Sequence, residues 1–372
     1  MDQSKKEKGI VLVGTAKGLL ELTKENSLWK ISKDHFRGLP VSCVYEHPTT
    51  GRWWVGINHR HWGQKLYVSD DSGNSWQEYS VPSYPATAQL SNGKAAVLKK
   101  IWCLQAADDN SDAMWMGTEP GGLFYSPTKD APFELVESLW SHPSREDGNQ
   151  WFGAGRDHPF IHSIVVDPRN PNQVYVAVSC AGVFKTEDGG KNWFPKNNGL
   201  ISAYLPNPNV EIGHDPHLVL QCKSSPSILW QQNHCGIFRS TNGGEDWSLV
   251  SDENKIPHYG FSLVIDNNNP MKAWVIPSIS DLERVPSNLA LTVHHTSDGG
   301  KSWKAQREGL PQEYCYDLVY RHAFAKKNQV LVFGTANGNL YLSEDEGYHW
   351  QSISTYLARV ETICFAGNTL NP

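Results

Sequence analysis

The stretch TEDGGKNW, from Thr186 to Trp193, decides the fold, because its pattern Ser/Thr-x-Asp-x-Gly-x-x-Trp recurs along the chain. Other intact copies begin at Ser69, Thr296 and Ser343, and a further copy at Ser240 has Asn in place of Asp. In such a segment the Asp side chain caps backbone N–H groups, Gly adopts a positive φ angle, and Trp begins the next strand. The pattern therefore predicts a repeated β-hairpin turn whose role is structural. The residues expected to hold these turns are Asp71, Asp188, Asn242, Asp298 and Asp345.

The spacing of the motif sets the architecture. Its tryptophans lie about 50 residues apart, except before Trp193, where one double-length step contains an eroded copy at Ser126–Phe133. Each repeat runs through an apolar strand, a turn, a second strand, a Gly-bearing loop and a third strand that enters the motif, as residues 162–186 show. Four antiparallel strands per repeat and seven repeats predict an all-β fold, a seven-bladed β-propeller.

The two ends of the chain predict how the ring closes. The first repeat begins directly with a second strand, Ile10–Gly14, whereas the last motif is followed by an additional first strand, Val360–Ala366. We expect this last strand to complete the first blade, which then comprises about residues 9–32 plus 358–367 and leaves no exposed sheet edge. Residues 1–372 are thus predicted to form a single domain, although length alone would suggest two or three.

Composition excludes several classes of partner. The 33 Lys and Arg residues against 39 Asp and Glu give a net charge of −6, which provides no basic field for nucleic acid. Since no apolar run approaches the roughly 20 residues of a membrane-spanning helix, we expect no membrane contact. The 7 cysteines occur singly, which argues against a disulfide framework or a structural zinc site. Lys5, Lys6 and Lys8 before the apolar segment 9–15 imitate a signal peptide, but similar segments recur at 114–122 and 330–338 as strands. A cytoplasmic location is expected.

The repeated turns resemble the Asp-box, or BNR, repeats of the sialidase-like propellers, and the resemblance covers essentially the whole chain. The layout is similar to that of bacterial proteins labelled glycosyl hydrolase or exo-sialidase. This resemblance implies a carbohydrate-active enzyme that binds a small, anionic or glycan-like ligand at the central mouth. Sialidases also carry three arginines and a Phe/Tyr-Arg-Ile-Pro motif, of which residues 36–40 (FRGLP) are only a loose echo. True sialidase activity is therefore not expected.

A propeller places the loops that enter the first strand, and those that join the second strand to the third, on one face. Most of the 15 histidines fall in these loops. We expect Glu119 and His234 to be catalytic, because each departs from the repeat consensus where a loop faces the axis; for Glu119, a loop-capping role is the alternative. The expected ligand-binding residues are His59, His61, Trp62, His162, His217, Asn233 and Arg284. For Arg284, a salt bridge to Asp281 or Glu283 is the alternative to binding a carboxylate.

The spacing of His59-x-His61 and of His214-x-x-His217 is that of metal ligands, so His59, His61, His162 and His217 are candidates for a divalent ion. Hydrogen-bonded histidines without a metal are the alternative, and no other cofactor is expected. Two further functions remain open. One is a non-catalytic binding or assembly propeller with a protein partner, and the other is a metal-dependent lyase or hydrolase that uses the histidines.

Overall fold

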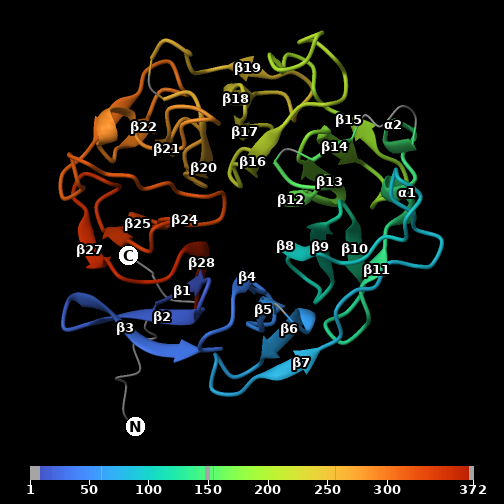
Figure 1. The fold of residues 1–372 in the computed structure, drawn as a ribbon, viewed down its shortest axis with the longest axis horizontal. Coiled ribbons are helices and arrows are strands. Elements are labelled where there is room, and N and C mark those ends of the chain that lie inside the picture. Colours follow the sequence, from blue (N-terminus) through green and yellow to red (C-terminus); the bar gives the residue numbers. More distant parts are fainter. Residues whose placement is uncertain (1–8, 60, 147–150, 154, 256, 368–372) are drawn as a thin grey trace.

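Seven four-stranded antiparallel sheets stand around a central axis as the blades of a propeller (Figure 1). The computed structural model describes residues 9–59, 61–146, 151–153, 155–255 and 257–367. Each inner strand contacts the inner strands of the two neighbouring blades, so the ring is continuous. The predicted fold class is confirmed.

In every blade the strands follow one another from the axis outward. Blade 1 contains β28 (Val360–Ala366), β1 (Ile10–Thr15), β2 (Gly18–Glu25) and β3 (Leu28–His35). Blade 2 contains β4 (Val41–Glu46), β5 (Trp53–His59), β6 (Gly63–Ser69) and β7 (Gln77–Tyr79). Blade 3 contains β8 (Lys100–Ala106), β9 (Met114–Glu119), β10 (Leu123–Ser126) and β11 (Glu134–Leu135). Blades 4 and 5 contain β12 (Ile161–Asp167), β13 (Asn170–Val178), β14 (Gly182–Thr186) and β15 (Phe194–Pro195); and β16 (Pro216–Gln221), β17 (Leu229–Asn233), β18 (Gly236–Ser240) and β19 (Ser248–Leu249). Blades 6 and 7 contain β20 (Gly260–Ile265), β21 (Ala273–Pro277), β22 (Val293–Thr296) and β23 (Lys304–Gln306); and β24 (Phe324–Lys327), β25 (Val330–Gly334), β26 (Leu340–Ser343) and β27 (Gln351–Ser354).

The first blade is closed by the last strand, as the sequence predicts. In Figure 1 the red β28 lies beside the blue β1, and the two pair antiparallel from Ile10 opposite Ala366 to Thr15 opposite Val360. β3 extends to His35, a few residues beyond the predicted end of this part of the blade. The closure joins the N-terminal and C-terminal segments in one sheet.

Glycines in the second strands are explained by close packing at the axis. A Cβ atom at Gly117 would lie 2.5 Å from the carbonyl oxygen of Ile161 and 2.7 Å from Cys103 Sγ. A Cβ atom at Gly334 would lie 2.5 Å from the side chain of Val360. Real Cβ atoms do not approach other atoms so closely, so glycine at these positions lets the inner strand of the next blade pack against the second strand.

The repeated turns have the predicted geometry. In the turn after β14, Asp188 Oδ1 accepts hydrogen bonds from the backbone N–H groups of Lys191 and Asn192 at 3.0 and 2.9 Å. Thr186 Oγ1 accepts one from Gly190 N at 3.0 Å, where Gly190 has a φ of 91°. The Trp of the motif then bonds to the preceding blade: Trp247 Nε1 donates to Lys196 O at 2.8 Å. The motif thus stabilises both the turn and the seam between blades.

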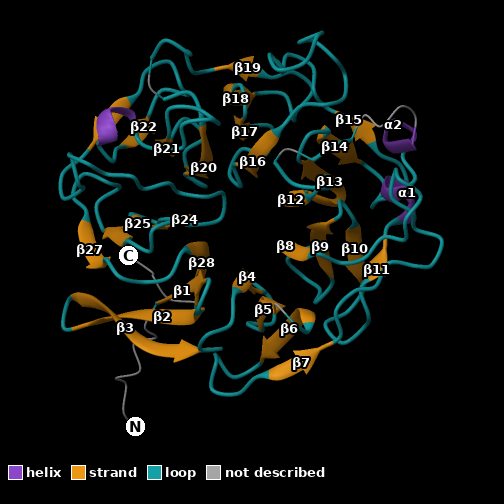
Figure 2. Ribbon diagram, in the orientation of Figure 1, coloured by secondary structure: helices purple, strands orange, loops and turns teal. Residues whose placement is uncertain are grey.

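Helices are few and short (Figure 2). Among the described residues they are α1 (Glu137–Trp140), α2 (Pro143–Glu146) and the 3₁₀ helix η2 (Ser287–Leu289), all within long insertions whose helical character the sequence pattern did not reveal. Within the described ranges, no helix has the length and apolarity needed to cross a bilayer. All seven cysteines are free thiols.

Candidate functional site

A cavity of about 290 Å³ lies at the central mouth of the ring. All seven blades contribute to its wall, through their inner strands, the loops that lead into them, and two loops that join second to third strands. The lining residues are Ser42, Lys100, Trp102, Gly155, Arg156, Phe160, Asp215, His217, His234, Phe261, Asp281, Arg284, Tyr320, Arg321, His322, Arg359 and Glu361. The cavity therefore lies on the face that the loop arrangement predicts.

A β-bulge near the start of six inner strands changes the direction of one side chain per strand. At each bulge the register skips one residue, which is then free of the pairing constraint that alternates its neighbours across the sheet. The skipped residues are Ser42, Trp102, His162, His217, Phe261 and Glu361. All of these except His162 line the cavity. In blade 7 the described pairing of β24 has no such shift, and the cavity residues precede the strand.

The wall is rich in positive charge. Five cationic side chains line the cavity against three carboxylates: Lys100, Arg156, Arg284, Arg321 and Arg359 against Asp215, Asp281 and Glu361. Four of the five cations have a carboxylate partner. Lys100 and Arg359 pair with Glu361, Arg156 with Glu119, and Arg284 with Asp281.

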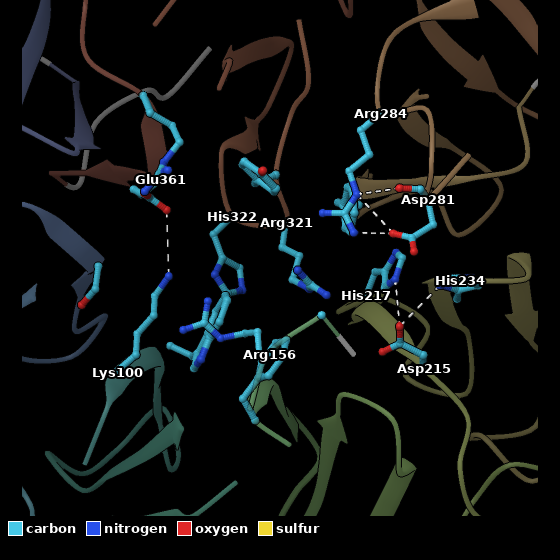
Figure 3. Close-up of a pocket in the computed structure, with 17 residues that line it drawn as sticks. Lys100, Arg156, Asp215, His217, His234, Asp281, Arg284, Arg321, His322 and Glu361 are labelled. Carbon is cyan, nitrogen blue, oxygen red and sulfur yellow. Dashed lines mark hydrogen bonds and ion pairs between the residues drawn. The ribbon is translucent and has the colours of Figure 1, made fainter. Parts of the chain in front are cut away.

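Arg321 is the exception. Only 9% of this residue is exposed, yet its guanidinium has no hydrogen bond or ion pair within the described part of the chain, and its Nε is a buried donor without a partner. The guanidinium lies 5.2 to 5.8 Å from the ring centroids of Trp102, Phe160 and Phe261. Burial lowers its pKa, although Asp215 acts in the opposite direction. Figure 3 shows Arg321 at the centre of the cavity, with dashed lines at its neighbours and none at its own guanidinium.

Aromatic rings form the apolar part of the wall. Trp102 and Phe160 are stacked, with ring centroids 4.3 Å apart and an interplanar angle of 14°. Phe261 stacks on His217 at 4.6 Å. Such rings pack against the C–H faces of a sugar, whereas the arginines between them bind acidic groups. The wall thus combines apolar ring faces with charged groups.

Asp215, His217 and His234 form a polar group at one end of the cavity (Figure 3). His217 Nε2 lies 3.2 Å and His234 Nδ1 lies 3.6 Å from Asp215 Oδ2. Asp215 and His217 are buried, whereas the His234 side chain is 28% exposed. Within the described ranges these three residues are the one group of His, Cys, Asp and Glu side chains whose ligand atoms converge, all within 4.8 Å of one another.

The charge state of Asp215 and His217 follows from their surroundings. Burial alone would raise the pKa of Asp215, but His217, His234 and Arg321 hold it well below its ordinary value, so the carboxylate is ionised. Burial lowers the pKa of His217, and the neighbouring Asp215 opposes that shift without overcoming it. The ionised carboxylate thus lies at hydrogen-bonding distance from the imidazole ring of His217.

The two residues expected to be catalytic lie in different surroundings. His234 lines the cavity and faces Asp215. Glu119, at the end of β9, is only 4% exposed and lies outside the lining. Its Oε2 accepts hydrogen bonds from Arg156 Nε at 2.6 Å and from Trp102 Nε1 at 3.4 Å. Glu119 thus positions two cavity residues from behind the wall.

Of the expected ligand-binding residues, His217 and Arg284 line the cavity and the others do not. His59 Nδ1 accepts hydrogen bonds from the backbone N–H groups of His61 and Trp62, on an exposed loop outside the cavity. Asn233 is buried, and its amide bonds to Gln231 and Cys235. Arg284 has the salt bridge to Asp281 that was its alternative, and it faces the cavity as well.

The predicted set of four metal-ligating histidines is not assembled, because its members are occupied or apart. Both ring nitrogens of His162 bond within the fold, Nε2 to Pro216 O and Nδ1 to Ser163 Oγ, each at 2.8 Å. His59 and His61 belong to the exposed loop described above, and only His217 belongs to the convergent group. His214, the partner of His217 in the sequence pattern, bonds to Ser202 and Val210 and so secures the insertion before β16.

Several cavity residues were not predicted from the sequence, chiefly Lys100, Trp102, Arg156, Asp215, Phe261 and Glu361. They share no motif, because each occupies its own place in a different blade. A positional signal could have found three of them, because Trp102, Phe261 and Glu361 are the second or third residues of apolar inner strands. Arg321 and Arg284 stand out in the sequence as arginines of later blades, but sequence alone does not indicate their orientation.

The fold and its cavity define a seven-bladed propeller with a charged central cavity, and comparisons show which proteins it is similar to. No protein-family model matches the chain. The chain is 24% identical over 279 residues to the oligoxyloglucan-reducing end-specific xyloglucanase of Emericella nidulans, covering 64% of this chain and 30% of the relative. It is 22% identical over 305 residues to a xyloglucanase of Acetivibrio thermocellus, covering 70% and 32%. The chain thus spans about a third of the length of these curated relatives.

Solved structures give the same fold. An ancestral GH74 enzyme matches with a TM-score of 0.54 and 17% identity, covering 87% of this chain and 38% of that one. The periplasmic gluconolactonase of Pseudomonas aeruginosa matches with a TM-score of 0.61 and 10% identity, covering 98% of this chain and 100% of that one. At these identities the likeness concerns the propeller fold alone.

Proposed function

We propose that the protein is a carbohydrate-active enzyme whose central cavity binds a small acidic saccharide, of the hexuronate or sugar-acid class. The observation that carries this proposal is Arg321, a buried guanidinium that faces the cavity and has no hydrogen-bond or ion-pair partner among the described residues. A buried charge without compensation destabilises a fold by several kcal/mol, so an anion that completes it is bound strongly. A carboxylate matches the two parallel donors of a guanidinium.

The size and chemistry of the cavity support this ligand class. About 290 Å³ is near the lower end of the roughly 300–1,000 Å³ typical of small-molecule sites, which suits one or two sugar residues. The aromatic rings of Trp102 and Phe160 provide an apolar surface beside the arginines. The relationship to xyloglucanases supports saccharide chemistry, and the acidic group is what the excess of cations adds.

The alternative, a non-catalytic assembly propeller, would not need such a site. A surface for a protein partner is satisfied by exposed loops, whereas here a ligand-sized cavity contains a guanidinium with no hydrogen bond or ion pair among the described residues. We therefore place the function in the cavity and the reaction at its polar end, where Asp215, His217 and His234 converge.

The test is a binding measurement followed by an activity screen. Glucuronate and its neutral counterpart, methyl glucoside, are titrated into the protein by calorimetry, and unsaturated or nitrophenyl glycosides of uronic acids are then screened for turnover. Arg321→Met removes the charge but retains the length of the side chain, and loss of its charge-assisted hydrogen bonds, worth about 1.5–3 kcal/mol each, should weaken glucuronate binding roughly ten- to a hundredfold.

Arg37→Met is the matched control, since it removes one positive charge from an exposed loop far from the cavity lining. It should leave glucuronate binding unchanged. Equal affinity for glucuronate and methyl glucoside, or an unaltered affinity in Arg321→Met, would contradict the proposal.

A further inference from the structure

Hydrogen bonds hold the ring of His217 on both sides. Its Nδ1 donates to the carbonyl oxygen of Gly260 at 2.6 Å, since a carbonyl oxygen can only accept. Its Nε2 lies 3.2 Å from the carboxylate oxygen Oδ2 of Asp215. A proton or a metal ion between these two atoms makes their approach favourable.

The carboxylate of Asp215 is held in place by its other oxygen. Oδ1 accepts hydrogen bonds from Ser179 Oγ at 2.9 Å and from the backbone N–H of Cys180 at 3.2 Å. Oδ2 is left facing the two histidines. Such outer contacts orient ligands in metal sites, as does the carbonyl of Gly260 on the far side of His217.

His234 completes the group from the next loop of the same blade. Its ring packs edge to face against Tyr204 and Tyr259, with centroids 5.0 and 5.5 Å apart, which fixes its plane. Its Nδ1 lies 3.6 Å from Asp215 Oδ2, too far for a hydrogen bond but suitable for two ligands of one ion. Figure 3 shows both histidines beside the same oxygen of Asp215, each joined to it by a dashed line.

We propose that Asp215, His217 and His234 bind one divalent transition-metal ion at the polar end of the cavity. The ion would lie between the three ligand atoms, which fall within 4.8 Å of one another. Two imidazole nitrogens and one carboxylate oxygen suit Zn²⁺, Co²⁺, Fe²⁺ or Ni²⁺ rather than Ca²⁺ or Mg²⁺, which prefer oxygen ligands throughout. Because all three residues line the cavity, the remaining coordination positions open onto it.

The ion and Arg321 share one cavity, and this arrangement determines where the carboxylate of the ligand lies. Two positive centres disfavour each other unless a ligand neutralises both, so a carboxylate bound at Arg321 has its second contact at the metal. This part of the inference rests on the proposed function. It predicts that metal and glucuronate strengthen each other's binding, and thermodynamic linkage makes the two effects equal.

The metal is tested with Co²⁺ on the full chain after treatment with EDTA, because Co²⁺ reports its own ligands by absorption. We expect one equivalent to bind with the visible bands of nitrogen and oxygen coordination and without the near-ultraviolet charge-transfer band of a thiolate. Asp215→Asn and His234→Gln should each weaken Co²⁺ binding at least tenfold. His234 is on the rim, so His234→Gln provides the test even where Asp215→Asn fails to fold.

The double variant His59→Gln/His61→Gln is the matched control, since it removes two histidines outside the convergent group, and it should bind Co²⁺ normally. No binding in the unaltered protein, a thiolate band, or loss of binding only in the control would each overturn the metal site. Arg321→Met separates the two proposals. It should retain Co²⁺ binding but lose the mutual strengthening by glucuronate, whereas failure of the anion proposal alone leaves the Co²⁺ results as described.

Discussion

Arg321 and Arg52 are two almost equally buried arginines with opposite surroundings, and this contrast yields a prediction of opposite sign. Arg321 is 9% exposed and has no ion-pair or hydrogen-bond partner in the described ranges, whereas Arg52 is 5% exposed and makes a bidentate pair with Asp70 at 2.6 and 2.8 Å. Arg52 also donates to Lys129 O at 2.8 Å and to Asp130 at 3.2 Å. We expect Arg321→Met to stabilise the ligand-free protein and Arg52→Met to destabilise it.

The magnitudes follow from what each change removes. Arg321→Met eliminates one buried donor without a partner, worth about 1–3 kcal/mol, and the burial cost of its charge. It also loses weak attraction to three aromatic rings, worth roughly 1 kcal/mol, so the net gain is about 1–2 kcal/mol. Arg52→Met loses charge-assisted hydrogen bonds and should cost about 2–3 kcal/mol.

Thermal and urea unfolding of both variants, without ligand and at one pH, provide the assay. An unfolding entropy of about 2 cal/mol/K per residue converts 1 kcal/mol into a Tm shift of roughly 1.3 °C for a chain of this length. The Tm of Arg321→Met should therefore rise by roughly 1–3 °C, and that of Arg52→Met should fall by roughly 3–4 °C. A fall in both variants would refute the reasoning, because it would mean that the fold itself compensates Arg321.

Two further predictions concern the scaffold. Asp188→Ala removes the acceptor of two backbone N–H groups and should lower the midpoint of urea unfolding. Asp188→Asn should lower the midpoint less, because Asn242 makes the equivalent bond to Asp246 N at 3.0 Å in the next repeat. Equal losses in the two variants would argue against a capping role. Burial, with Lys272 adding to it, lowers the pKa of His295 to about 4, so between about pH 6.5 and pH 4 the unfolded chain binds a proton that the folded protein does not. Stability is thus fully present above pH 6.5 and falls as pH decreases to 4, by at most about 3 kcal/mol for this residue. His295→Phe keeps the stack on Trp274 and should flatten this acid loss in a pH series of urea unfolding, whereas a variant of the exposed His349 should not.

The sequence predicts the ring because the ring is built from a repeated motif whose interactions are short-range. The Asp188 turn and the seam tryptophan Trp247 are short-range features, and closure by β28 follows from counting strands. The cavity is different, because it depends on six register shifts that leave no composition signal. His214 shows the limit: its spacing from His217 suggested a ligand, but the residue that faces His217 is its sequence neighbour Asp215.

The bulges also separate residues that hold the ring from residues that only face the cavity. The side chains of His162 and His217 bond across seams, to Pro216 and Gly260 of the next blade. The side chains of Ser42, Trp102, Phe261 and Glu361 line the cavity and make no hydrogen bond to a neighbouring blade among the described residues. A combinatorial library confined to these four positions would therefore vary the chemistry of the mouth on a constant backbone.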